Sequence, residues 1–192
     1  MAKLKICGLR RLEDIEYVNE LKPDYIGFIL TKGFRRSIDR DTAKMLKSHL
    51  SKDINAVGVF VNEKKENIDY FLKNGIIDTV QLHGDESNDF CKSIDAPVIK
   101  YFSPKSFEKV GEYDVDYFLF DSGTGTGKEF DWSSVPKVEK PFFLAGGINK
   151  DNISRAVETV KPYCIDLSSA VETNGVKDYN KIKEITEIMK NE

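Results

Sequence analysis

A cysteine and an aspartate stand at the ends of two apolar segments, where their side chains could move protons. Cys7 closes residues 3–7 and is followed by a glycine, and Asp121 closes residues 117–121. Thiol and carboxyl groups both serve enzymes as general acids, bases or nucleophiles. Each residue also has a structural interpretation, since a lone cysteine is often a small buried side chain and a strand-end aspartate often organises a loop. The neighbouring segments decide between these interpretations.

Other polar residues and glycines end further apolar segments in the same way. They are Arg35 and Arg36 after residues 25–30, Gln81 and His83 in residues 79–83, Gly146 and Gly147 after residues 142–145, and Ser168 and Ser169 after residues 164–167. An arginine can bind a planar carboxylate through two parallel hydrogen bonds, although it can also be a solvated charge. Paired glycines let the backbone approach a phosphate, and the nearby serines favour this interpretation over a simple tight turn.

These residues share one position in a pattern that repeats eight times, with a mean repeat of about 24 residues. Strands are expected at residues 3–7, 25–30, 56–61, 79–83, 98–101, 117–121, 142–145 and 164–167. Helices are expected at residues 11–21, 39–50, 64–73, 85–94, 131–138, 151–160 and 178–189, with a short or irregular one at 103–112. Alternation of this kind predicts a parallel sheet with right-handed crossovers. Eight units favour an α/β fold of the TIM-barrel type, a single (β/α)₈ domain spanning residues 1–192.

In such a barrel the carboxyl ends of all strands meet at one face, so the residues above converge on one site. Cys7 and Asp121 facing each other across a small substrate suit an isomerase, in which one group removes a proton and the other supplies one. An ordinary thiol has a pKa near 8.5, so Cys7 needs a nearby cation or helix end to act as a base at neutral pH. The glycine-rich residues 122–128 do not fit the Walker pattern, because Glu129 follows the lysine, and we expect them to form a mobile lid.

The composition limits the kind of partner. The chain has 192 residues, of which 40% are hydrophobic and 32% charged, which suits one domain with a sizeable core. A net charge of −3 argues against nucleic acid or a polybasic membrane surface, and no apolar run reaches the roughly 20 residues that span a bilayer. The three separated cysteines form no metal-type pair and predict no disulfide framework. Together with the lack of a signal-like first segment, they predict a cytoplasmic protein.

With these residues in place, the chain resembles the phosphoribosylanthranilate isomerase family, (β/α)₈ enzymes of tryptophan biosynthesis. The resemblance spans the whole chain and rests on seven blocks in the family's order. These blocks are Lys5-Ile6-Cys7-Gly8, Gly27-Phe28 with Arg36-Ser37-Ile38, Val57-Gly58-Val59-Phe60-Val61-Asn62, Gln81-Leu82-His83-Gly84, Gly125-Thr126-Gly127-Lys128 through Phe130-Asp131-Trp132, Ala145-Gly146-Gly147-Ile148, and Asp166-Leu167-Ser168-Ser169-Ala170-Val171-Glu172.

The resemblance implies an Amadori rearrangement of N-(5'-phosphoribosyl)anthranilate to 1-(2-carboxyphenylamino)-1-deoxyribulose 5-phosphate. Asp121 would be the general acid that opens the ribose ring, and Cys7 the general base that removes the C2' proton. The substrate-binding residues implied are Arg36, Gln81, His83 and Asp166, and the phosphate-binding residues are Gly146, Gly147, Ser168, Ser169 and Ala170. Arg36 matches the family arginine that holds the anthranilate carboxylate, because its register with Ser37 favours it over Arg35.

The resemblance implies no metal and no organic cofactor, since the substrate's own nitrogen stabilises the intermediate. The expected partner is the phosphoribosyl substrate, and the chain is expected to be a monomer or a homodimer. One departure from the family pattern is Ala170, where relatives often have glycine; its methyl group is compatible with phosphate binding if only the backbone N–H is used.

Two other functions stay open at this stage. The aldose–ketose isomerase of histidine biosynthesis shares the reaction type but has an aspartate where this chain has Cys7. A barrel that only senses a phosphorylated ligand would have lost catalysis, against which Cys7, Asp121 and Arg36 argue. Indole-glycerol-phosphate synthase is disfavoured, because the lysines expected within strands, Lys5 and Lys100, lack its local sequence pattern.

Overall fold

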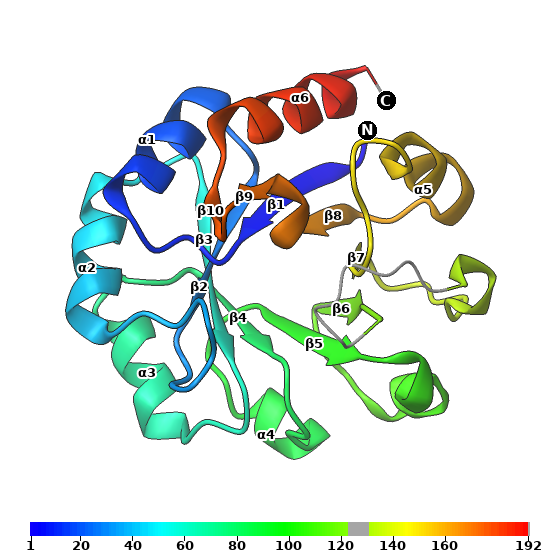
Figure 1. Ribbon diagram of the computed structural model, residues 1–192. Helices are drawn as coiled ribbons and strands as arrows, with labels where there is room; N and C mark the ends of the chain where they lie inside the picture. The colour runs from blue at the N-terminus through cyan, green and yellow to red at the C-terminus, as the bar shows by residue number, and fades with distance from the viewer. Residues whose placement is uncertain (123–130, 192) are drawn as a thin grey trace.

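Eight parallel strands close into a barrel in the computed structural model, which describes residues 1–122 and 131–191. Figure 1 shows the strands in a ring with the helices outside it. The strands are β1 (Lys3–Cys7), β2 (Tyr25–Ile29), β3 (Asn55–Phe60), β4 (Thr79–Leu82), β5 (Val98–Phe102), β6 (Tyr117–Phe120), β7 (Phe142–Leu144) and β8 (Cys164–Leu167). The predicted TIM-barrel fold is therefore confirmed, and each strand lies within one residue of its expected bounds. The further prediction that residues 1–192 form a single domain stays a prediction.

Side chains alternate between the two faces of each strand, which gives the barrel two apolar layers. On β1, Leu4 and Ile6 belong to the layer between strands and helices, whereas Lys5 and Cys7 have the opposite orientation. A second cluster fills the interior of the barrel and consists of Tyr25, Val57, Ile99, Leu119, Phe143, Ala145 and Cys164. The alternation therefore carries every second residue of a strand, including Cys7, toward the barrel axis.

Helices cover the outside of the barrel and bury their apolar stripes against it. They are α1 (Leu12–Leu21), α2 (Arg40–His49), α3 (Lys65–Lys73), α4 (Asn88–Lys92), α5 (Ile153–Val160), α6 (Tyr179–Lys190) and the 3₁₀ helices η1 (Pro104–Glu112), η2 (Trp132–Ser134) and η3 (Ser169–Val171). Capping aspartates begin three of them, since Asp39 accepts a hydrogen bond from the Thr42 N–H, Asp131 from the Ser133 N–H and Asp178 from the Asn180 N–H.

Three helices are shorter than the sequence pattern predicts. The expected helix at 85–94 begins only after Ser87, because the carboxylate of Glu86 is already bound to the N–H groups of Asn62 and Gly84. The expected helix at 131–138 is the single turn η2, which ends before Pro136, a residue that disfavours helical geometry at the position preceding it. The expected helix at 151–160 begins at Ile153, after a turn formed by the preceding asparagines.

A two-stranded antiparallel hairpin follows β8 and was not predicted. It consists of β9 (Glu172–Thr173) and β10 (Val176–Lys177), joined by Asn174 and Gly175, which both have positive φ angles. An Asn–Gly pair is the strongest short-range signal for a tight hairpin, so the sequence did contain the indication. The hairpin matters for the site because it carries Glu172 and Lys177.

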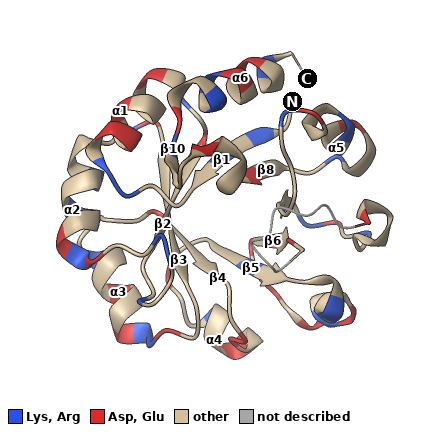
Figure 2. Cartoon of the chain, viewed as in Figure 1, with Lys and Arg blue, Asp and Glu red and all other residues tan. Residues whose placement is uncertain are grey.

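Charged side chains of both signs are spread over the outer helices and loops (Figure 2). Within the described residues, no helix is long and apolar enough to cross a bilayer. The two charged side chains of the strands that bear most on the site, Lys5 and Asp166, are buried inside the barrel. The Lys5–Asp166 pair therefore places charge inside the barrel, on the strands β1 and β8.

Candidate active site

A cavity of about 560 Å³ opens at the carboxyl ends of the strands. Its lining includes every residue that the sequence assigned to catalysis, substrate binding or phosphate binding. These residues are Cys7, Arg36, Gln81, His83, Asp121, Gly146, Gly147, Asp166, Ser168, Ser169 and Ala170. The cavity lies at the face where (β/α)₈ enzymes carry their active sites. The structure thus brings together residues from six different strand ends and their loops.

Cys7 ends β1 and its thiol lies beside Gly27 on β2, its partner in the strand register. The thiol is largely buried, and this burial raises its pKa above the ordinary value. The positive charges of Lys5 and Lys177 act in the opposite direction but only partly offset the desolvation. The cations expected beside Cys7 are therefore present, although burial still keeps the pKa of its thiol above the ordinary value.

An ion pair forms the floor of the cavity. The Lys5 ammonium donates hydrogen bonds to Asp166 Oδ2 at 2.7 Å and to Gln81 Oε1 at 2.9 Å. Burial alone would lower the pKa of Lys5, but the interactions of Lys5 with its neighbours, Asp166 foremost, together outweigh this effect and raise the pKa above the ordinary value. Lys5 is therefore charged. Asp166 Oδ1 is buried and has no hydrogen-bond partner among the residues described. One acceptor oxygen of the floor is therefore left to a ligand.

His83 continues this hydrogen-bonded chain. Its Nδ1 lies 3.0 Å from Gln81 Nε2, and its ring stacks on Tyr101 with centroids 3.9 Å apart. Because an amide nitrogen only donates, Nδ1 is the acceptor and the neutral ring carries its proton on Nε2. Burial lowers the pKa of His83 to about 4, and the charges of Lys5 and Lys100 contribute to the shift. His83 is thus a neutral hydrogen-bond donor in the cavity wall.

Asp121 follows β6 and faces the loop after β7. Two strands, β7 and β8, separate it from Cys7 on the shorter way round the barrel. A methyl group on Gly146 would lie 2.5 Å from Asp121 Oδ1, so only glycine leaves room for this carboxylate. Gly146 also has a φ angle of +83°, which side chains disfavour. The first glycine of the pair therefore accommodates Asp121 as well as forming its own loop.

The proposed phosphate cradle is made by the loops after β7 and β8. Gly147 has a φ angle of +71°, and its carbonyl accepts hydrogen bonds from the side chains of Asn149 and Asn152. Ser169 begins the turn η3, so its N–H and that of Ala170 have no acceptor within the turn. Backbone donors of this kind suit an anion, and the methyl group of Ala170 does not remove its donor.

Ser168 makes hydrogen bonds to other residues of the site through both its hydroxyl and its carbonyl. Its hydroxyl donates a hydrogen bond of 3.0 Å to the carbonyl of Cys7, and its own carbonyl accepts one of 2.9 Å from Lys177. The hydroxyl hydrogen is therefore directed at β1, where it fixes the end of the strand that carries the thiol. Ser168 therefore contacts the end of β1 and also lines the cavity, and its expected role in phosphate binding stays a prediction.

Of the two adjacent arginines, Arg36 lines the cavity and Arg35 does not. The side chain of Arg36 is 16% exposed and that of Arg35 is 56% exposed. Both bind the carboxylate of Glu172, which also accepts a hydrogen bond from Lys177. Glu172, Lys177 and Lys5 had no expected role, although Lys5 and Glu172 belong to the sequence blocks that match the family.

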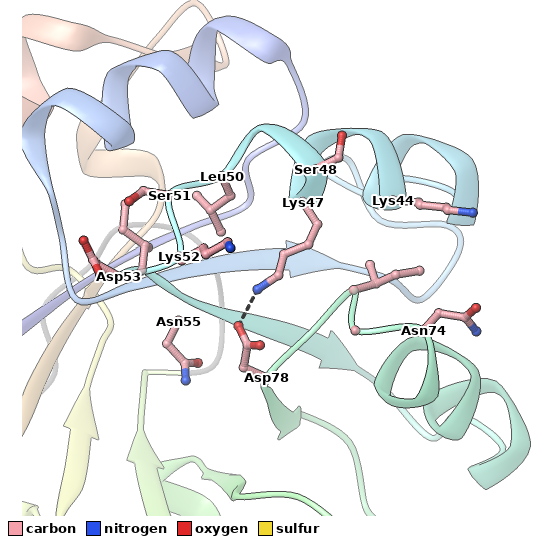
Figure 3. Close-up of a pocket in the computed structure, with 13 residues that line it drawn as sticks. Lys44, Lys47, Ser48, Leu50, Ser51, Lys52, Asp53, Asn55, Asn74 and Asp78 are labelled. Atoms are coloured by element: carbon pink, nitrogen blue, oxygen red, sulfur yellow. Dashed lines mark hydrogen bonds and ion pairs between the residues drawn. The ribbon is translucent and has the colours of Figure 1, made fainter.

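A second cavity, of about 840 Å³, lies at the opposite end of the barrel between α2 and α3. Figure 3 shows its lysine-rich wall, in which Lys47 is paired with Asp78 at 2.5 Å. Asn55 at the start of β3 and Asp78 just before β4 place it at the amino ends of the strands. In this fold, that end serves stability, so the second cavity is not a candidate for catalysis.

Two expectations concern absent or undescribed features. Within residues 1–122 and 131–191, no group of three or more His, Cys, Asp or Glu side chains is arranged to hold a metal ion. The lid expected at residues 122–128 falls almost entirely outside the described residues.

A closed parallel barrel with a buried thiol, a carboxyl group and an arginine gathered at the carboxyl edge defines a (β/α)₈-barrel enzyme. The family model of N-(5'-phosphoribosyl)anthranilate (PRA) isomerase matches residues 4–188. The chain therefore belongs to the PRA isomerase family.

Individual relatives agree with this assignment. The N-(5'-phosphoribosyl)anthranilate isomerase of Endomicrobium trichonymphae is 46% identical over 99% of both chains. The solved structure of a dimeric phosphoribosylanthranilate isomerase from Thermotoga maritima, studied as monomers, is 31% identical and superposes with a TM-score of 0.86 over 100% of both chains. Another solved isomerase, 30% identical with a TM-score of 0.85 over 100% of both chains, contains reduced 1-(o-carboxyphenylamino)-1-deoxyribulose 5-phosphate.

Proposed function

We propose that this chain isomerises N-(5'-phosphoribosyl)anthranilate to 1-(2-carboxyphenylamino)-1-deoxyribulose 5-phosphate, with Cys7 as general base and Asp121 as general acid. Family membership carries the isomerase activity and its place in tryptophan biosynthesis. The observation that carries these residue roles is that Cys7, Asp121 and Arg36 line the same cavity as the Gly146–Gly147 loop and the Ser168–Ser169 loop.

The first step opens the ribose ring. Asp121, in its protonated form, gives its proton to the ring oxygen while the bond between that oxygen and C1' breaks. The electron pair of the anilino nitrogen forms the new C1'–nitrogen double bond, which yields a Schiff base. The close approach of the Asp121 carboxyl group to Gly146 supports this role, because it places the proposed acid in the cavity wall next to the proposed phosphate cradle.

The second step transfers the C2' proton. Cys7, as the thiolate, removes it, and the electron pair moves into the Schiff base to form an enolamine, which then tautomerises to the ketone. The thiolate is needed because a neutral thiol is a poor base. Lys5 and Lys177 both favour the charged form of Cys7 electrostatically, so their positions support this assignment.

The remaining residues would hold the substrate at both ends. Arg36 would bind the carboxylate of the anthranilate ring, and the backbone N–H groups around Gly147, Ser169 and Ala170 would bind the phosphate. Asp166 Oδ1, buried and left without a partner by the described residues, is suited to accept a hydrogen bond from a ribose hydroxyl. His83, with its proton on Nε2, is suited to donate one.

The two alternative functions, another aldose–ketose isomerase and a sensor without catalysis, predict different residues or a different outcome at the cavity. The aldose–ketose isomerase of histidine biosynthesis would require a carboxylate in place of Cys7. A sensor without catalysis would bind the phosphosugar and leave it unchanged. The choice between monomer and homodimer, and the cytoplasmic location, stay predictions from the sequence.

The test generates phosphoribosylanthranilate in situ and follows the loss of its fluorescence after the protein is added. We expect rapid turnover by the unmodified chain and a loss of at least roughly 100-fold in the Cys7→Ser and Asp121→Asn variants. Cys91→Ser, a change of the same kind in the outer layer, should keep most of the turnover. No acceleration by the unmodified chain would refute the function, and near-normal turnover by either site variant would refute the residue roles.

A further inference from the structure

We propose that Glu172 is a positioning residue for Arg36, which it turns so that the terminal edge of the guanidinium group faces the cavity and binds the substrate's carboxylate. The inference deepens the proposed function and rests on it. It assigns a role to the β9–β10 hairpin, which carries Glu172 just after the proposed phosphate loop.

The contact between the two side chains is bidentate. Arg36 Nε lies 2.6 Å from Glu172 Oε1, and Arg36 Nη2 lies 2.9 Å from Glu172 Oε2. Two parallel hydrogen bonds between planar groups fix both the distance and the rotation of the guanidinium. Neither side chain is free in solvent, since that of Glu172 is 5% exposed and that of Arg36 is 16% exposed.

The hydrogen bonds also determine which edge of Arg36 can serve a ligand. A guanidinium group presents two bidentate edges, one formed by Nε with Nη2 and the other by Nη1 with Nη2. Glu172 occupies the first edge, so a second carboxylate can be bound bidentately only by the terminal edge. Since Arg36 lines the cavity, this edge would approach the ligand end-on.

The backbone supports the same orientation from the other side. A methyl group on Gly8 would lie 2.5 Å from Arg36 Cδ, so the aliphatic part of the arginine runs directly over the end of β1. The main chain of the hairpin is fixed as well, because Arg10 donates to the Gly175 carbonyl at 2.8 Å and Lys181 donates to the Glu172 carbonyl at 2.7 Å. Glu172 therefore lies on a hairpin, β9–β10, whose main chain is held in place by hydrogen bonds.

The charge balance leaves the cluster attractive to an anion. Three cations, Arg35, Arg36 and Lys177, contact the single carboxylate of Glu172, so the cluster has two more positive than negative charges. Burial alone would raise the pKa of Glu172, but the hydrogen bond from Arg36 and the charge of Lys177 lower it to about 2. Glu172 is thus ionised at neutral pH, and it orients Arg36 without cancelling the positive charge offered to a ligand.

A purely structural role for Glu172 makes a different prediction. If the carboxylate only fastens the hairpin, its removal should weaken all ligands of the cavity to the same extent. If it positions Arg36, its removal should weaken ligands that carry the ring carboxylate much more than ligands that lack it. The two cases are separated by two stable probes: the reduced product analogue with its ring carboxylate, and the corresponding phenylamino compound without it.

The experiment measures the dissociation constants of both probes by calorimetry for the unmodified chain and for Glu172→Gln, Glu172→Asp and Arg36→Met. We expect Glu172→Gln to weaken the carboxylated probe by roughly 10-fold to 100-fold and the other probe by less than threefold. Glu172→Asp retains the charge, so it should recover part of the lost affinity. Glu184→Gln, the same change in an exposed ion pair with Lys150, should affect neither probe.

The possible outcomes test the positioning role of Glu172 separately from the proposed isomerase function. Equal weakening of both probes by Glu172→Gln, or no weakening of either, would overturn the positioning role. In another outcome, Arg36→Met weakens the carboxylated probe more than the other probe, whereas neither Glu172 variant does so. That result would support the contact between Arg36 and the ring carboxylate and would refute the positioning role of Glu172. If Arg36→Met does not discriminate either, the contact assigned to Arg36 is wrong and the inference falls with it. Isomerase turnover, measured separately, reports on the proposed function.

Discussion

Gly27 and Cys7 are register partners on β2 and β1, and a methyl group at Gly27 would lie 2.6 Å from the Cys7 sulfur. This separation is well below van der Waals contact, so the thiol occupies the space that a side chain on β2 would need. The proposed base can occupy this position only because the neighbouring strand has a glycine, and so no side chain, at residue 27.

Gly27→Ala should displace the thiol and lower kcat by at least roughly 10-fold, because a shift of about 1 Å at a proton-transfer group is costly. Steady-state kinetics measure the effect. Gly111→Ala is the matched control, since a methyl group there meets nothing within 4 Å. Normal kcat in Gly27→Ala would show that the thiol position does not limit turnover.

Lys5→Met should raise the pKa of Cys7 further, because Lys5 is the largest of the influences that lower it. The base acts as the thiolate, so the rise of kcat/KM with pH should move to higher pH in the variant. A pH–rate profile measures the shift.

Lys177→Met provides an independent variant, since Lys177 also lowers the pKa of Cys7 without taking part in the Lys5–Asp166 pair. Its profile should move in the same direction by a smaller amount. Profiles that coincide with that of the unmodified chain in both variants would contradict the assignment of the alkaline limb to Cys7.

The neutral state of His83 predicts a pH dependence of stability. The folded-state pKa of about 4 lies below the ordinary histidine pKa of 6.5, so the unfolded chain binds the proton first as the pH falls. The free energy of unfolding should decrease between pH 6.5 and pH 4, with His83 contributing at most roughly 3 kcal/mol.

Urea titrations at several pH values, compared with His83→Asn, isolate this contribution, because the variant should lose less stability over the same interval. The exposed His49 on α2 offers a matched control, and His49→Asn should follow the unmodified chain. An unchanged pH dependence in His83→Asn would show that the imidazole is not held neutral by the fold.

Gly146→Ala should impair both the proposed acid and the phosphate loop. Its methyl group would meet Asp121 Oδ1 at 2.5 Å, and the φ angle of +83° disfavours a side chain. We expect kcat to fall at least roughly 10-fold and the affinity for inorganic phosphate to fall as well. Gly75→Ala has a comparable positive φ angle but nothing within 4 Å of its methyl group, so it should affect stability and leave both quantities unchanged.

The strands and the site were predictable because both depend on a short-range pattern. Apolar segments ending in Cys7, His83 or Asp121 are visible in the sequence, and a parallel barrel carries all strand ends to one face. The resemblance to a family then attached chemistry to these positions. The family and the fold are confirmed, whereas the individual residue roles stay predictions.

The features that the sequence did not reveal depend on contacts between distant segments. Glu86 delays the start of α4 through a hydrogen bond from the Asn62 N–H, and the Ser168 hydroxyl donates to the carbonyl of Cys7, which is distant in sequence but lies on the adjacent strand. Lys5 and Glu172 stood in matched blocks, but only the packed structure shows that they are partners of Asp166 and Arg36. Periodicity predicts which face a side chain occupies and does not predict its partner.

The closure of the barrel by β1 and β8 has a consequence for synthesis of the chain. Of the eight barrel strands, β1 is synthesised first, whereas its second neighbouring strand, β8, is synthesised last. Until then, Lys5 cannot meet Asp166, and the end of β1 is not yet fixed by Ser168. The nascent polypeptide therefore carries an unpaired edge on β1 until β8 has been made, and the cavity can assemble only after that point.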